Sequence, residues 1–228
     1  MALLPSLGRA CYALRFRLFD RRRHQTRVRE RIDGLDLEIG PEVFHPALFF
    51  SSRVLAEAMR RELGVEDRSL LDLGCGSGYL ALRAARETPA LSRVLGVDLS
   101  PDAVLCARGN AARNAVVPRV EVRQGDLFGP VGREQFDLIV MNPPYLEGEV
   151  RRPWDLSWVD QGGVVGRLAR SAAGHLTERG RLLLLGSSLA RRSALEPFAA
   201  PAWDSEVAAR RRLWSGEVLT VWRLRPRS

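Results

Sequence analysis

Hydrophobic positions along the chain form short apolar runs that alternate with longer segments of helical spacing. The clearest run is Phe136–Met141, where five of six residues are apolar, and it ends abruptly in Asn-Pro-Pro-Tyr. Such a run is typical of a strand buried on both faces of a parallel sheet. Neither Pro143 nor Pro144 can donate to a sheet ladder, so the prolines end the strand and hold Asn142 at its carboxyl edge. Ligands of open α/β sheets bind at that edge, so we predict an active-site loop here.

From Ser69 onward the pattern predicts strands that alternate with helices. Ser100-Pro101-Asp102 is a strong helix start, with serine at the N-cap, proline at the first helical position and an acid in the first turn. A closing hairpin is expected around a turn at Ser215-Gly216. The strands that we predict are 70–73, 94–98, 120–123, 136–141, 181–185, 207–212 and 218–224, and helices are predicted up to about 87, from 100 and over 161–177.

The segment before Ser69 predicts a basic helical extension over residues 1–40, followed by the main domain over 41–228. Residues 3–19 have apolar positions at helical spacing, and Arg21-Arg22-Arg23 follows them. An Asp-Gly turn signal then precedes a short strand with alternating Leu35, Leu37 and Ile39. A further helix is predicted over about 47–63; Ser51 and Ser52 in its first turns could contact a ligand or cap the helix.

Length and composition favour one globular domain with a short appendage. The chain has 228 residues, of which 46% are hydrophobic, and it lacks the run of ~20 apolar residues that a membrane span requires. Its three cysteines form no Cys-x-x-Cys pair, which argues against a zinc cage or a disulfide framework. These features predict a cytoplasmic protein without a membrane partner, with a mitochondrial presequence as the alternative reading of the N-terminus.

The formal charge of +8 is concentrated at the two ends of the chain, and all 35 basic residues are arginine. Residues 1–31 hold nine arginines against two acids, and residues 205–228 hold six against two. The N-terminal arginines are either a solvated helix end or an arm that contacts the phosphates of a nucleic acid.

A glycine-rich loop, Asp72-Leu73-Gly74-Cys75-Gly76-Ser77-Gly78, joins a predicted buried strand to a helix. Its glycines permit positive φ and close approach of a ligand to the backbone. The spacing is neither the dinucleotide Gly-x-Gly-x-x-Gly nor a Walker motif, which argues against a pyrophosphate ligand.

Two further acids follow the next two predicted strands. Asp98 lies 20 residues beyond Gly78, where a carboxylate could accept both hydroxyls of a ribose, although it could also simply cap the next helix. Asp126 could accept an adenine amino group, or could be a turn residue beside Gly125. Together with Asp72 these acids describe a nucleoside pocket without phosphates.

These motifs, in this order, resemble those of class I S-adenosylmethionine-dependent methyltransferases. The Asn-Pro-Pro-Tyr signature resembles that of enzymes acting on planar nitrogens, including HemK-type release-factor glutamine methyltransferases of the methyltransferase small domain family. The resemblance implies a Rossmann-like α/β fold with a seven-stranded, mostly parallel sheet, helices on both faces and a C-terminal antiparallel hairpin. It also implies S-adenosyl-L-methionine as the cofactor, bound by Asp72, Gly74, Cys75, Gly76, Gly78, Asp98, Leu99, Asp126, Leu127 and Asn142.

Two other stretches extend the resemblance to release-factor enzymes. Val43–Ala47 is similar to their Val-Tyr-Glu-Pro-Ala element, and Trp158–Gly166 is similar to the stretch that follows their Asn-Pro-Pro-Tyr. The chain departs from them at 48–50, where Leu-Phe-Phe replaces an acid and a threonine.

The resemblance implies a catalytic set of Asn142, Pro143, Pro144 and Tyr145. Asn142 would accept one N–H of the substrate nitrogen and the Pro143 carbonyl the other, so that the lone pair points at the methyl group and no strong base is needed. Phe44, His45 and Tyr145 are the predicted substrate contacts, with the two aromatic rings stacked on the planar group. A lone histidine such as His45 is more often structural.

Three functions remain open at this level. The leading one is methylation of a glutamine in a protein such as a translation release factor. The alternative is an amino group of RNA or DNA, adenine N6 or guanine N2, which the basic N-terminus favours. A non-catalytic binding module is a further alternative, whereas a metal enzyme is disfavoured because His24, His45 and His175 show no ligand spacing.

Overall fold

The computed structural model describes residues 26–41, 43–47, 50–144, 163–190, 193–198 and 201–227. The helix predicted over 3–19, the run Arg21–Arg23, Tyr145 and Trp158 lie outside the described residues. Among the described helices, none has the length and apolar character needed to cross a membrane.

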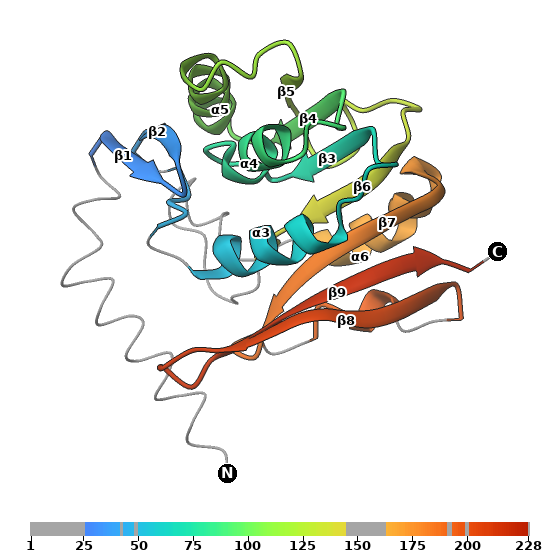
Figure 1. Cartoon of the computed structure of the whole chain (residues 1–228). Helices are drawn as coiled ribbons and strands as arrows, with labels where there is room; N and C mark the ends of the chain where they lie inside the picture. Colours follow the sequence, from blue (N-terminus) through green and yellow to red (C-terminus); the bar gives the residue numbers. More distant parts are fainter. Residues whose placement is uncertain are drawn as a thin grey trace.

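A seven-stranded sheet in the order β5-β4-β3-β6-β7-β9-β8 organises the chain (Figure 1). The first five strands of this order run parallel, and β9 is antiparallel to both β7 and β8. The predicted α/β class, the seven strands and the C-terminal hairpin are therefore confirmed. The strands are β3 (Ser69–Leu73), β4 (Arg93–Asp98), β5 (Val120–Gln124), β6 (Phe136–Met141), β7 (Leu176–Ser187), β8 (Trp203–Arg212) and β9 (Val218–Pro226).

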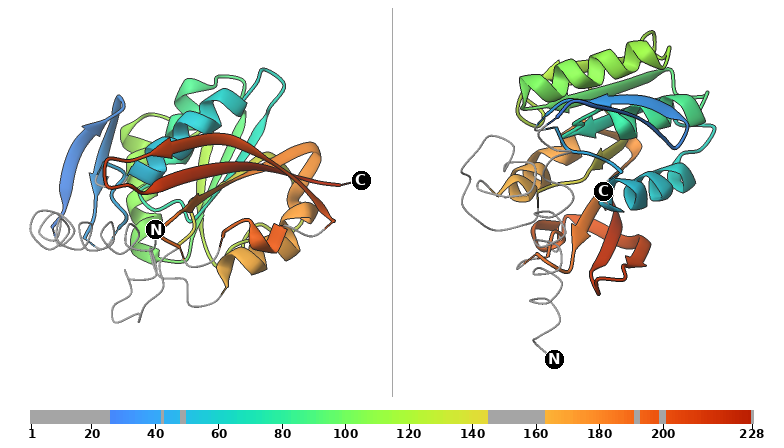
Figure 2. Two further views of the ribbon diagram at one scale, coloured as in Figure 1. Left: turned by 90° about the horizontal axis from the view of Figure 1, so that it is seen from below. Right: turned by 90° about the vertical axis from the view of Figure 1, so that its left-hand side faces the viewer.

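Helices cover both faces of this sheet, because successive residues of each buried strand point to opposite sides. Leu138 and Val140 of β6 enter the core beneath α3, α4 and α5, whereas Ile139 and Met141 enter the core beneath α6. Figure 2 shows the two layers of helices with the sheet between them. The helices are α3 (Phe50–Glu62), α4 (Tyr79–Glu87), α5 (Pro101–Arg113) and α6 (Val164–Ser171), with the 3₁₀ turns η3 (Ala172–His175) and η4 (Glu196–Phe198).

The described part of the predicted N-terminal extension is a β-hairpin, not a helix. Strands β1 (Val28–Ile32) and β2 (Leu35–Ile39) are antiparallel around Asp33 and Gly34, which have φ values of 48° and 82°. Positive φ at both central residues is what a type I′ turn requires, and Asp-Gly supplies it readily. Sequence reasoning found the turn and β2 but missed β1, whose apolar residues alternate with arginine and glutamate.

Two asparagines, one in α5 and one at its C-cap, join this hairpin to the main domain. The Asn110 side chain accepts from the Glu38 amide at 2.8 Å and donates to the Glu38 carbonyl at 3.0 Å. Asn114, one helical turn later, makes the same pair of bonds with Asp36, at 3.0 and 2.9 Å. The open edge of β2 is thus satisfied by side chains, and Leu35, Leu37 and Ile39 pack in the same core as α4 and α5.

The helix predicted over 161–177 was too long. Helix α6 ends at Ser171, and after η3 the chain is already extended at Leu176. Leu176 is paired with Phe136 at the start of β6, so sheet pairing prevails over the helical spacing of its apolar residues. Strand β7 consequently has 12 residues instead of the five that we predicted.

Candidate functional site

The glycine-rich loop turns tightly at the carboxyl end of β3. The amides of Gly74 and Cys75 both donate to the Val97 carbonyl, at 2.8 and 3.1 Å, which draws the loop across the end of β4. Gly74 and Gly76 have φ values of 71° and 54°, in the left-handed region that favours glycine. A Cβ on Gly74 would meet no atom within 4 Å, so the backbone there is open to a ligand.

Cys75 and Gly78 serve the packing of this loop. The Cys75 thiol is buried against Gly96, where a Cβ would lie only 3.1 Å from the sulfur. Burial raises the pKa of the Cys75 thiol well above its ordinary value. Gly78 precedes α4 and has φ of 82°. It packs so closely against Ala107 that a Cβ added to Gly78 would lie 3.1 Å from the Cβ of Ala107. Of the loop positions predicted to bind cofactor, Cys75 can therefore contribute only its backbone.

Asp98 fastens the loop to the next strand. One of its carboxylate oxygens accepts from the Gly76 amide at 2.8 Å, and the other accepts from the Ser100 amide at 2.9 Å. Burial raises the pKa of Asp98, while these backbone bonds oppose the rise. The Leu99 amide also bonds to this carboxylate, and a carboxylate has about four lone-pair sites, so at least one remains for a hydroxyl donor. Leu99, the next residue, exposes most of its side chain.

Asp72 is the most deeply buried acid of the site, with 1% of its surface exposed. One oxygen accepts from the Ala81 amide at 3.2 Å, and the other has no hydrogen-bond partner in the part of the chain that the structure describes. Burial raises the pKa of Asp72 from 3.8 to about 7. A buried carboxylate oxygen without a partner is costly, and a donor on a bound ligand would relieve that cost.

Asp126 and Leu127 follow β5. The carboxylate of Asp126 pairs with the guanidinium of Arg167 on α6, and half of the side chain is exposed. Leu127 has φ of 48°, which re-aims the chain after β5. The ion pair occupies one carboxylate oxygen of Asp126. That Asp126 accepts from an adenine amino group stays a prediction, and the second oxygen is the one available for it.

Asn142 directly follows β6, at the same edge of the sheet. Its amide nitrogen donates to the Ser51 hydroxyl at 3.1 Å and, at 3.5 Å, reaches that of Ser52. Its carbonyl oxygen is buried and has no partner among the described residues. The two serines, both buried at the start of α3, thus orient the carboxamide and leave its acceptor unused. Sequence reasoning singled out both serines without connecting them to Asn142, which is 91 positions from Ser51.

The predicted substrate contacts lie in different surroundings. Phe44 is half-buried beside the glycine-rich loop, with its Cβ 3.7 Å from where a Cβ on Gly76 would lie. His45 has 1% of its surface exposed, and its Nδ1 accepts from the Ala47 amide at 3.3 Å. Its Nε2 lies 3.8 Å from the Glu30 carboxylate. This placement favours the structural role of His45, so its contact with substrate, like that of Phe44, stays a prediction.

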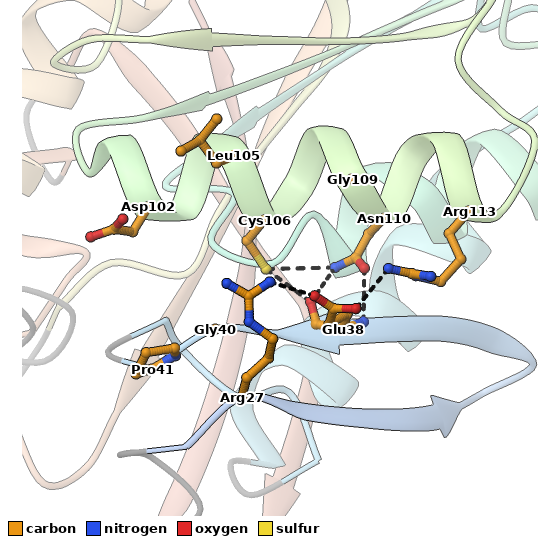
Figure 3. A pocket seen from close by; sticks show the side chains of 10 residues that line it. All are labelled: Arg27, Glu38, Gly40, Pro41, Asp102, Leu105, Cys106, Gly109, Asn110 and Arg113. Atoms are coloured by element: carbon orange, nitrogen blue, oxygen red, sulfur yellow. Dashed lines mark hydrogen bonds and ion pairs between the residues drawn. The ribbon is translucent and has the colours of Figure 1, made fainter.

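A pocket of about 510 Å³ lies away from these residues, between α5 and the β1–β2 hairpin (Figure 3). The Glu38 carboxylate forms ion pairs there with the guanidinium groups of Arg27 and Arg113, at N–O distances of 2.6 and 2.8 Å. The Cys106 thiol donates to the Glu38 carbonyl at 3.1 Å. None of Asp72, Asp98 and Asn142 lines this pocket, so we do not assign it to the candidate site.

Comparison with known proteins gives a family and the same fold. Residues 39–198 match the family model of the methyltransferase small domain. A release factor glutamine methyltransferase of Aliivibrio fischeri is 42% identical over 116 residues, which cover 50% of this chain and 39% of that protein. A putative protein N5-glutamine methyltransferase of Methanocaldococcus jannaschii is 28% identical over 203 residues, covering 85% and 98%.

Two further similarities concern nucleic acid and fold. A tRNA1(Val) (adenine(37)-N6)-methyltransferase of Porphyromonas gingivalis is 38% identical over 88 residues, which cover 36% of this chain and 34% of that protein. The crystal structure of a ribosomal protein L11 methylase of Lactobacillus delbrueckii has a TM-score of 0.59 at 20% identity, covering 78% and 79%. The chain thus spans about two fifths of the length of the Aliivibrio fischeri enzyme and nearly all of the Methanocaldococcus jannaschii protein.

The seven-stranded sheet, with its antiparallel C-terminal hairpin, is the fold of class I, S-adenosylmethionine-dependent methyltransferases. The chain belongs to the methyltransferase small domain family, whose model matches more than half of it. The residues present fit the family's cofactor. The open backbone at Gly74 would leave room for its close approach. The oxygen of Asp72 that lacks a partner among the described residues would accept a hydrogen bond from it, and the carboxylate of Asp98 would accept from its hydroxyl groups.

The raised pKa of Asp72 predicts a pH dependence of stability. Between 3.8 and about 7 the folded protein keeps a proton that the unfolded chain releases, so the free energy of unfolding should fall as pH rises through this interval. In Asp72→Asn the titrating group is absent, and we expect the free energy of unfolding of the cofactor-free protein to decline less steeply from about pH 5 to about pH 7, within this window. Urea unfolding of the wild type and of Asp72→Asn at several pH values measures this pH dependence of the free energy of unfolding.

Asp137 provides the matched control. Burial would raise its pKa, but bonds from the Arg68 amide and from Ser69 outweigh burial and lower it. Asp137 is therefore ionised in both states across that pH range, and Asp137→Asn should shift the whole curve without changing its slope. An unchanged slope in Asp72→Asn would show that Asp72 is already ionised in the folded protein.

Proposed function

We propose that the protein transfers a methyl group from S-adenosyl-L-methionine to a planar amide or amino nitrogen. The observation that carries this proposal is the carboxamide of Asn142, whose buried oxygen lacks a partner among the described residues while its nitrogen is held by Ser51. An acceptor oriented in this way suits an N–H donor on the substrate. Asn142 lies at the same sheet edge as Asp72 and Asp98, which would bring it close to the bound cofactor.

The chemistry asks the protein mainly to position a weak nucleophile. The lone pair of an amide or aromatic amine is delocalised, and Asn142 would accept one of its N–H groups while the Pro143 carbonyl accepts the other. Pro143 and Pro144 keep that carbonyl out of the sheet ladder. When bound, the cofactor supplies an electrophilic methyl group on a sulfonium. The proton can leave after transfer, so no strong general base is required, and the two carbonyl dipoles stabilise the developing positive charge on nitrogen.

The acceptor that we favour is a glutamine side chain in a protein, of the kind found in translation release factors. Similarity to two glutamine methyltransferases supports it, including one matched along nearly its whole length. The alternative is an amino group of RNA or DNA, adenine N6 or guanine N2, which similarity to a tRNA adenine-N6 methyltransferase supports. A non-catalytic module is less favoured, because a binding fold has no physical need for the oriented amide acceptor. We expect the protein to act in the cytoplasm.

Transfer of a labelled methyl group into a cell lysate tests the reaction and the acceptor class together. Label removed by protease supports the glutamine proposal, and label removed by ribonuclease or deoxyribonuclease supports the alternative. Absence of any labelled macromolecule, together with absence of a thermal shift on adding S-adenosyl-L-methionine, would leave only the binding module.

Replacing Asn142 should separate chemistry from cofactor binding. Asn142→Ala removes one preorganised acceptor, and we expect the rate of methyl transfer to fall by ~10²-fold or more while cofactor still binds. Ser51→Ala should lower kcat by a smaller factor, about fivefold, because it frees the amide nitrogen without removing the acceptor. Ser51→Thr keeps the hydroxyl and is the conservative control. A rate within threefold of wild type for Asn142→Ala (about 0.7 kcal/mol) would eliminate this role.

Replacing Asp98 should act on the cofactor. Asp98→Ala removes an acceptor for ribose hydroxyls and also releases the Gly76 amide, so we expect weaker binding of S-adenosyl-L-methionine. Isothermal titration calorimetry measures this, with Asp102→Ala, an exposed acid of the next helix, as the control. Unchanged affinity would remove Asp98 from the cofactor site.

A further inference from the structure

The turn between β8 and β9 carries exposed cationic and aromatic side chains that the methyltransfer site does not use. Arg210, Arg211 and Arg212, which we call the tip arginines, are the last three residues of β8 and are all exposed. Trp214 follows in the turn with 73% of its surface exposed. Exposed arginine on an edge strand is common, but an exposed tryptophan beside three of them is not explained by solubility.

Within the described residues the tip arginines have no acidic partner. Among the described residues none of the three is in an ion pair, and the residues opposite them on β9 are Thr220, Leu219 and Val218. Farther from the turn the same hairpin is neutralised, since Arg223 pairs with Glu62 and Glu206. The positive charge of the hairpin is therefore concentrated at its turn.

The turn is also firmly anchored. Leu213 donates to the Glu217 carbonyl at 2.8 Å, and Gly216 closes the turn with φ of 83°. The one acid in this turn, Glu217, is buried and accepts from the Ser187 hydroxyl at 2.5 Å at the end of β7. Its carboxylate is thus directed inward and leaves the tip arginines unscreened. Side chains on a fixed backbone lose less freedom when they bind a partner.

Topology places this turn at the same edge of the sheet as Asn142. Strand β7 is parallel to β6, and two antiparallel pairings later β8 runs in that direction again, so its final residues reach the carboxyl edge. Figures 1 and 2 show the β8–β9 turn at the end of the sheet to which β3 and β6 point. A macromolecule bound at the tip would lie on the substrate side of the protein.

We propose that the tip arginines and Trp214 form a binding site for single-stranded RNA. Guanidinium groups bind phosphates, and an exposed indole offers a face on which an unpaired base stacks. An acidic polypeptide would satisfy the arginines but gives no comparable use to the tryptophan. The site does not depend on the identity of the methyl acceptor, because it would bring the enzyme to an RNA substrate or to a protein substrate assembled with RNA.

Fluorescence anisotropy with a labelled single-stranded RNA of about a dozen nucleotides, a length within the usual site sizes, tests the proposal. Replacing the three tip arginines by glutamine should weaken binding and reduce the slope of log K against log salt by about 2, since each phosphate contact contributes ~0.7 on single strands. Trp214→Ala should weaken binding about fivefold or more with the slope unchanged.

The matched control is a second triple variant that removes the same charge from the opposite edge of the sheet, where the parallel strands begin. Arg61, Arg133 and Arg179 are exposed, have no ion pair among the described residues and lie near the end of α3 and the starts of β6 and β7. Their triple replacement by glutamine should leave RNA affinity within about twofold of wild type. Equal losses in the two triple variants would overturn the proposal in favour of non-specific attraction to net charge.

Two further results would also overturn it. Displacement of the RNA by polyglutamate as effectively as by unlabelled RNA would make the tip a surface for acidic protein. Aggregation of the tip-arginine variant, seen by light scattering, with no RNA binding by wild type, would assign the arginines to protection of the β8 edge. Because these measurements do not involve methyl transfer, their failure is distinct from failure of the proposed function.

Discussion

The site depends on how β6 ends. An apolar strand buried on both faces meets two prolines that cannot continue its ladder, so the chain leaves the sheet with Asn142 at the edge. Burial there would ordinarily require partners for both ends of the carboxamide. The serines of α3 satisfy the nitrogen, and within the described residues the oxygen has none. The acceptor stays in place because β6 is packed on both faces of the sheet and shares one of these two cores with α3.

The carboxylates on the neighbouring strands follow the same logic. Asp72 is buried and Asp98 half-buried at strand ends where backbone amides partly satisfy them, and loss of hydration raises the pKa of both. Residual acceptor capacity at three neighbouring positions is costly for the empty protein and useful for a ligand that brings hydroxyl, ammonium and amide hydrogens. Binding of S-adenosyl-L-methionine should therefore stabilise the fold as well as equip it for transfer.

The choice between a protein and a nucleic-acid acceptor depends on the surroundings of the site. A centre that recognises an amide, as we propose for Asn142, would not distinguish glutamine from adenine, because both present two N–H groups on a planar nitrogen. Discrimination must come from surfaces farther out, such as the β8–β9 turn with its tip arginines and Trp214. The β1–β2 hairpin is another such element, since Asn110 and Asn114 fix it beside the glycine-rich loop and Asn110 also donates to the Ser77 carbonyl.

The sequence by itself determined the α/β class, the bounds of β6 and the acids at successive strand ends, because these follow from local periodicity and turn chemistry. It failed where a distant partner decided the outcome. Leu176 became strand through pairing with Phe136, and β1 formed through pairing with β2. Likewise only the tertiary structure connected Ser51 to Asn142 and separated the neutralised end of the last hairpin from its free arginines. Hydrogen bonds and ion pairs between residues far apart in the chain produce no local sequence pattern, so they could not be predicted from the sequence alone.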